Sequence, residues 1–135
     1  MPQEIGRIQV LIRSESDIAV ARRHIRELSS AQGFTVQEIE GFATAVSEIT
    51  RNSIVHARGG IVTLSIVRLG LRVGIIATMR DDGGGIASIE DAMRDGFSTR
   101  GGLGLGLPSA RRLVDEFELE SSVAGTTVIL KRWHE

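Results

Sequence analysis

The sequence contains no cysteine, and its only imidazoles are three histidines that lie far apart, His24, His56 and His134. Without cysteine the chain can form no disulfide, no thiolate nucleophile and no zinc-thiolate site. The three histidines also lack the close spacing that zinc ligands usually show. We therefore expect neither a zinc enzyme nor an enzyme with a cysteine nucleophile.

The chain also lacks a strong charge of either sign and any long apolar run. Its formal net charge is −1, whereas nucleic acid or an anionic membrane normally calls for a basic excess. No stretch approaches the ~18 apolar residues that span a bilayer, and the first residues lack the apolar core of a signal peptide. We expect a cytoplasmic protein with no nucleic-acid partner and no membrane partner.

Length and patterning favour one soluble domain over residues 1–135, because 41% of the residues are hydrophobic and 24% are charged. The patterns predict an α/β (α+β) two-layer sandwich, in which a mixed, mainly antiparallel sheet of about five strands is covered on one face by three helices. We expect a helix between Ser14 and Gly33 and another that begins at a Thr35/Glu38 capping box and ends near His56. A third helix is expected from Pro108, with Leu113, Val114 and Phe117 on its core face. The expected strands are 6–13, 61–67, 72–79, 118–123 and 126–133.

A glycine-rich span from Asp81 to Gly106 is too long for a simple connection. Glycines let backbone amides approach phosphate oxygens, so the run GGLGLGL, residues 101–107, fits a phosphate cradle at a helix start. A flexible hinge fits the glycines alone equally well. A P-loop is excluded because no lysine follows these glycines and the chain's one lysine is Lys131. The late position of the run, with Leu107 in the place of a third glycine, argues against a Rossmann fingerprint.

Glu48 and Asn52 lie four residues apart on the second expected helix, so their side chains project from one face about one turn apart. The amide oxygen of Asn52 is a hard, neutral ligand that suits Mg²⁺, and a carboxylate one turn away can deprotonate an attacking hydroxyl. A solvated Glu–Asn pair is the alternative that these two residues alone leave open.

Three motifs follow one another in order: Glu48-xxx-Asn52 on a helix, Asp81-x-Gly83-x-Gly85 after a strand, and GGLGLGL before a helix. This order resembles the N, G1 and G2 boxes of the GHKL (Bergerat-fold) superfamily of ATP-binding proteins. More narrowly, the stretch DGFSTRGGLGLGLPSARRLVDEFEL, from Asp95 to Leu119, is similar to the anti-sigma-factor-type serine kinases, especially the switch kinases of stressosomes. The resemblance covers nearly the whole chain.

The resemblance implies ATP and Mg²⁺ as cofactors and gives roles to matching positions. Asn52 would hold Mg²⁺ against the triphosphate, and Glu48 would be the general base for a protein hydroxyl. Asp81 would accept a hydrogen bond from the adenine amino group, and residues 87–101 would form an ATP lid. Further nucleotide contacts would come from Gly83, Gly85, Ile86, Arg100, Gly101, Gly102, Leu103, Gly104, Leu105, Gly106, Leu107 and Thr126.

The chain departs from the family pattern at three places. The turn before Thr126 is shorter than the usual Gly-x-Gly-Thr, Gly84 stands where proline is frequent, and no lysine is available for the γ-phosphate. Arg100 or Arg111 could take the place of that lysine, because a guanidinium binds phosphate with two hydrogen bonds.

The resemblance leaves three functions to be separated. The first is a serine kinase that phosphorylates a STAS-domain antagonist and then activates a PP2C-type phosphatase through its regulatory domain. The second is an anti-sigma factor kinase that also sequesters a sigma factor. The third is a nucleotide-dependent binding protein without transfer activity, which the presence of both Glu48 and Asn52 argues against.

Overall fold

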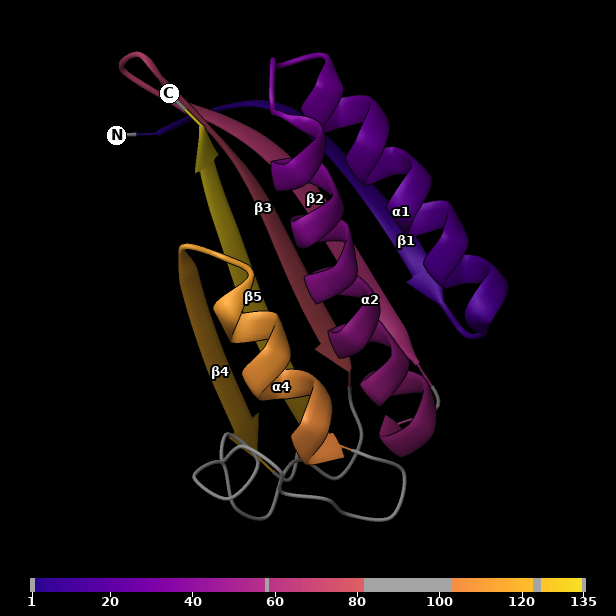
Figure 1. Ribbon diagram of the computed structural model, residues 1–135. Coiled ribbons are helices and arrows are strands. Elements are labelled where there is room, and N and C mark those ends of the chain that lie inside the picture. The colour runs from indigo at the N-terminus through magenta and orange to yellow at the C-terminus, as the bar shows by residue number, and fades with distance from the viewer. Residues whose placement is uncertain (1, 58, 82–102, 123–124, 135) are drawn as a thin grey trace.

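The computed structural model describes residues 2–57, 59–81, 103–122 and 125–134 (Figure 1). Within them the elements follow in the order β1 (Gln3–Ile12), α1 (Glu15–Ser30), α2 (Val36–Ala57), β2 (Gly60–Leu69), β3 (Arg72–Asp81), α4 (Leu103–Arg112), β4 (Glu116–Ser122) and β5 (Gly125–His134).

The five described strands form one sheet in the order β1-β2-β3-β5-β4. All four pairings are antiparallel, so the described sheet has no parallel pair and is not mixed as expected. Only two residues separate β2 from β3, and two separate β4 from β5, and strands so close in sequence can pair only as antiparallel neighbours. The three described helices cover one face and leave the other face open, which confirms the two-layer architecture (Figure 1).

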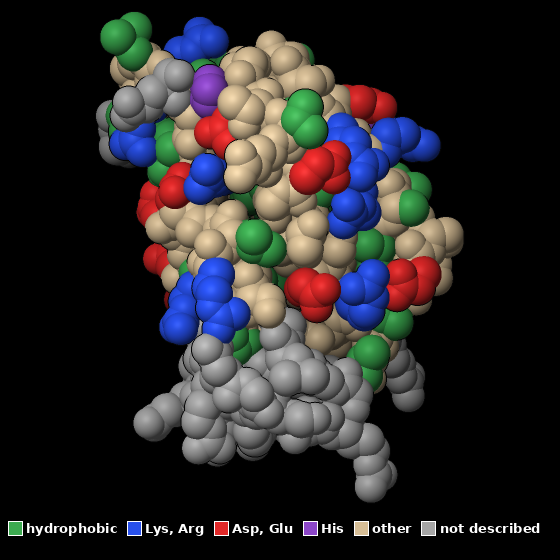
Figure 2. Space-filling view, in the orientation of Figure 1, with side chains coloured by type: hydrophobic (Ala, Val, Ile, Leu, Met, Phe, Trp, Pro, Cys, Tyr) green, Lys and Arg blue, Asp and Glu red, His purple; other side chains and the backbone are tan. Residues whose placement is uncertain are grey.

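One hydrophobic core lies between the sheet and the helices. The apolar residues that recur along α2 at helical spacing are buried: Ile39, Phe42, Ala43, Val46 and Ile49, with Phe42, Ala43 and Val46 fully buried. From the sheet, β2 contributes Val62 and Leu64, which alternate with outward-facing residues as a half-buried strand requires. Charged side chains of both signs are interspersed over the outer surface of the helix layer (Figure 2). The core therefore fixes α2 against the sheet, and with it any site that α2 carries.

Two expectations about the third helix are wrong. The helix α4 begins at Leu103, before Pro108, so Pro108 lies inside the helix and does not open it. It ends at Arg112, and Phe117 belongs to strand β4. Leu107 and Ala110 are buried where α4 packs on α2, and this apolar burial stabilises the helix despite its glycines.

The capping box at the start of α2 is confirmed and gives a stability prediction. The Glu38 amide donates to Thr35 Oγ1 at 3.1 Å, and the Thr35 amide donates to Glu38 Oε1 at 2.8 Å. Thr35→Ala removes the cap and should lower the free energy of unfolding by about 1 kcal/mol. Chemical denaturation of the parent and the variant measures this change in the free energy of unfolding. Thr44→Ala, at an exposed position inside the same helix, is the control and should cause no loss; equal losses in both variants would contradict the cap's role.

Candidate functional site

The candidate site begins with two side chains on one face of α2. Glu48 and Asn52 are both half-buried, one helical turn apart, beside the buried Ile49 and Ser53. This arrangement leaves a carboxylate and an amide accessible from the same direction, on a helix whose opposite side is fixed in the core. The pair can therefore contact one ligand together.

Arg51 supplies a positive charge beside this pair, and the sequence reasoning missed it. Its guanidinium Nη1 lies 3.6 Å from Glu48 Oε1, while Nε and Nη2 donate to the carboxylate of Glu15 on α1 at 2.8 and 3.3 Å. The hydrogen bond with Glu15 raises the pKa of Arg51, and the same bond lowers the pKa of the exposed Glu15 carboxyl. Arg51 thus links the Glu48 face of α2 to the start of α1. The contact that reveals Arg51 joins it to Glu15, 36 residues away, and no local sequence pattern shows it.

A second group of residues lies where β3 ends and β5 begins. Asp81 is the last residue of β3 and pairs with Thr126 in the sheet register, and the Thr126 amide donates to Asp81 Oδ1 at 3.3 Å. Asp81 lies two residues after the buried Met79 on β3, and Thr126 lies two residues before the buried Val128 on β5. Because side chains alternate along a strand, Asp81 and Thr126 are on the helix side of the sheet. The hydroxyls of Thr126 and Ser121 lie 3.1 Å apart. Ser121 is a neighbour that only the β4–β5 register reveals.

The C-terminal half of α2, the end of β3 and the starts of α4 and β5 lie at the same end of the molecule (Figure 1). The structure thus brings Glu48, Asn52, Asp81, Leu107 and Thr126 to one end. Outside the described residues lie Gly83, Gly85, Ile86, Arg100, Gly101 and Gly102. Leu103, Gly104, Leu105 and Gly106 lie in the first turns of α4, within the helix and not in a loop before it.

The described oxygen donors of the site are of the kind that Mg²⁺ takes. Among the described residues no group of three or more His, Cys, Asp or Glu side chains could hold a metal ion. Mg²⁺ is commonly bound through one or two protein oxygens, with waters and substrate phosphates completing its octahedron. The amide oxygen of Asn52, half-buried and one turn from Glu48, is suited to such a part.

These elements form an α/β domain in which a helix carries an acid–amide pair toward the end of a sheet. The chain belongs to the histidine kinase-like ATPase domain family, whose model matches residues 13–132. No described helix is long and apolar enough to cross a membrane.

Two curated relatives are similar over most of their length. The serine/threonine-protein kinase RsbT of Bacillus subtilis is 38% identical over 125 residues, which cover 92% of this chain and 94% of that protein. The anti-sigma F factor of Geobacillus thermodenitrificans is 35% identical over 134 residues, with 93% and 89% covered. The expected family is confirmed by both matches.

Solved structures agree with the fold. The RsbU and RsbW domains of Rv1364c from Mycobacterium tuberculosis match with a TM-score of 0.63 at 17% identity, over 97% of this chain and 34% of that one. The SiaB-SiaC complex from Pseudomonas aeruginosa matches with a TM-score of 0.55 at 16% identity, over 98% and 91%. At these identities the likeness concerns the fold alone.

Proposed function

We propose that this chain is a protein serine/threonine kinase that uses ATP with Mg²⁺ to phosphorylate a STAS-domain partner and then activates a PP2C-type phosphatase. The observation that carries the proposal is the half-buried pair Glu48 and Asn52, one turn apart on α2 at the end of the molecule where Asp81 lies. The likeness to RsbT, which is named a serine/threonine-protein kinase, supports the same activity.

In the proposed reaction Glu48, Asn52 and Asp81 each have one task. Glu48 takes the proton from the serine hydroxyl, whose oxygen bonds to the γ-phosphorus as the bond to the β-phosphate oxygen breaks and ADP leaves. Asn52 would hold Mg²⁺, which would supply positive charge to neutralise the triphosphate. Asp81 would accept a hydrogen bond from the adenine amino group, beside the Thr126 amide that already donates to its carboxylate. Catalysis then depends mainly on positioning, since phosphoryl transfer asks little covalent chemistry of the protein.

Incubation with γ-labelled ATP and a candidate STAS-domain protein tests the transfer directly. The expected product is labelled phosphoserine on the partner, formed only when Mg²⁺ is present. A folded protein that binds ATP and labels no serine would overturn the kinase proposal and leave a binding protein.

The role of Glu48 gives a prediction with a matched control. Glu48→Gln keeps the shape of the side chain but removes the base, so transfer should fall by about 10²-fold while ATP affinity stays close to the parent value. Glu40→Gln is the control, because Glu40 lies on the same helix and is also paired with an arginine, at 2.9 Å from Arg26. Equal rates in the two variants would assign the base to another group.

A second function is supported by the 35% identical anti-sigma F factor. In that case the same site would serve a protein that also sequesters a sigma factor. Retention of a sigma factor by the immobilised chain in the presence of ATP would favour this function, whereas retention of a phosphatase regulatory domain without the sigma factor would favour the first.

A further inference from the structure

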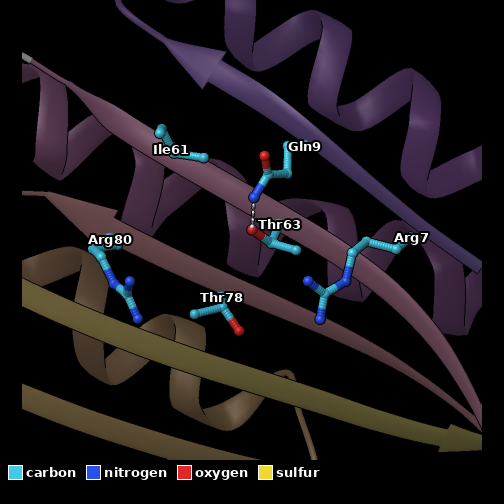
Figure 3. Close-up of a pocket in the computed structure, with 6 residues that line it drawn as sticks. All are labelled: Arg7, Gln9, Ile61, Thr63, Thr78 and Arg80. Atoms are coloured by element: carbon cyan, nitrogen blue, oxygen red, sulfur yellow. Dashed lines mark hydrogen bonds between the residues drawn. The ribbon is translucent and has the colours of Figure 1, made fainter. Parts of the chain in front are cut away.

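The open face of the sheet carries a polar hollow that the nucleotide site does not use. The hollow has a volume of about 350 Å³ and is lined by Arg7, Gln9, Ile61, Thr63, Thr78 and Arg80 from β1, β2 and β3 (Figure 3). These residues alternate out of phase with the core positions Val10, Val62 and Met79, so they lie on the side of the sheet away from the helices. The hollow is therefore a separate surface.

The strand register arranges the surface in rows. Leu11, Ile61 and Arg80 form one row across the three strands, and Gln9, Thr63 and Thr78 form the next. Within the second row Gln9 Nε2 donates to Thr63 Oγ1 at 3.3 Å. Arg7 belongs to the following row, so the two arginines occupy opposite corners, with Cα atoms about 16 Å apart by strand spacing. We call this arrangement the β1–β3 patch.

The two arginines of the β1–β3 patch differ in their pairing. On the helices, Arg26 and Arg51 are held by carboxylates at 2.9 and 2.8 Å. In the patch, Arg7 is paired with Glu4 at 3.1 Å, and no carboxylate of the described residues lies within ion-pair distance of the exposed Arg80. The two guanidinium groups lie on either side of Thr78 (Figure 3). Arg80 thus contributes a positive charge that no described carboxylate offsets, and Arg7 contributes an exposed guanidinium in an exposed pair with Glu4, beside hydroxyl and amide groups.

Exposed aliphatic side chains adjoin this charge. Leu11 and Ile61 face each other across β1 and β2 and are 48% and 44% exposed. Aliphatic side chains exposed beside arginine are typical of surfaces that bind proteins, because a partner covers the apolar groups while arginine binds carboxylates with two hydrogen bonds. A single small anion would cover neither the aliphatic pair nor both corners.

We propose that the β1–β3 patch is a docking surface for an acidic segment of a partner protein. Carboxylates of that segment bind Arg7 and Arg80, and an aliphatic side chain of the segment packs on Leu11 and Ile61. The segment binds on the sheet face opposite α2, so docking leaves the Glu48–Asn52 face accessible. This inference does not depend on the proposed kinase activity.

The test uses a fluorescein-labelled synthetic peptide of alternating glutamate and leucine residues with serine spacers, and a matched peptide with lysine at every glutamate. Fluorescence anisotropy should show binding of the acidic peptide alone, weakening as NaCl is raised. The double variant Arg7→Glu/Arg80→Glu should weaken binding by at least about tenfold. Ile61→Thr should weaken it less, through the apolar contact alone.

Arg23→Glu is the matched control, since Arg23 is 64% exposed and paired with Glu27 on α1, much as Arg7 is 59% exposed and paired with Glu4. It should leave the affinity unchanged, and circular dichroism and ATP binding should be normal in every variant. Three results would overturn the proposal: no binding of the acidic peptide, equal binding of the lysine peptide, or equal weakening by Arg23→Glu. Sedimentation that shows a dimer dissociated by the double variant would also overturn it, because the occupant would then be a second copy of the chain.

Discussion

Asn52→Ala is expected to lower serine phosphorylation by at least about 10³-fold, because charge neutralisation and positioning carry most of the rate of phosphoryl transfer. Asn52 lies on the half-buried face of α2, and its neighbours Ile49 and Ser53 keep that helix fixed in the core. The loss should therefore appear in transfer and in the Mg²⁺ dependence of ATP binding of a protein that still folds.

The variant Asn52→Asp tests whether residue 52 acts as a metal ligand or only as a structural side chain. An aspartate at this position keeps a hard oxygen for Mg²⁺ and should recover part of the transfer, with a shifted requirement for Mg²⁺. The rate at increasing Mg²⁺ concentrations, measured for the parent and both variants, makes the comparison. Transfer by Asn52→Ala within tenfold of the parent would show that the metal is held elsewhere.

The sequence predicted α2 well because two independent signals agree there. A capping box and a long apolar stripe mark the same helix, and both appear in the structure. Glu48 and Asn52 are fixed by that helix alone, since residues four apart share a face in any α-helix. This part of the candidate site needed no tertiary information.

The rest of the site depends on contacts between distant segments. The Asp81–Thr126 hydrogen bond joins residues 45 positions apart and follows from the β3–β5 register, which no local pattern encodes. The start of α4 was misplaced because its glycines and Pro108 read locally as a loop and a helix start. Burial of Leu107 and Ala110 against α2 reversed that local preference. Arg51 was missed for the same reason, since Glu15 contacts it from another helix.

Gly59 joins α2 to β2, and its replacement is expected to have the largest effect on stability. Its φ is +100°, which L-residues rarely adopt, and a Cβ there would collide with the backbone carbonyl of Ile12 at the end of β1. The Gly59 amide also donates to the Ser53 carbonyl at 2.8 Å, near the C-terminal end of α2. Gly59→Ala should therefore lower the free energy of unfolding by about 3 kcal/mol, from left-handed strain of about 1–2 kcal/mol and backbone displacement of about 1–3 kcal/mol.

Gly70→Ala is the control, because Gly70 has a φ of +62° but no heavy atom within 4 Å of its Cβ position. Gly70→Ala should lower the free energy of unfolding only by the left-handed strain, about 1–2 kcal/mol. Urea unfolding of the parent and the two variants gives the comparison, and equal losses would mean that contact with Ile12 contributes nothing. The Gly59 amide is hydrogen-bonded to Ser53, next to Asn52, so displacement of the backbone at Gly59 should disturb the end of α2. Gly59→Ala should therefore also weaken ATP binding. Gly70→Ala lies in the turn between β2 and β3 and should leave ATP binding unchanged.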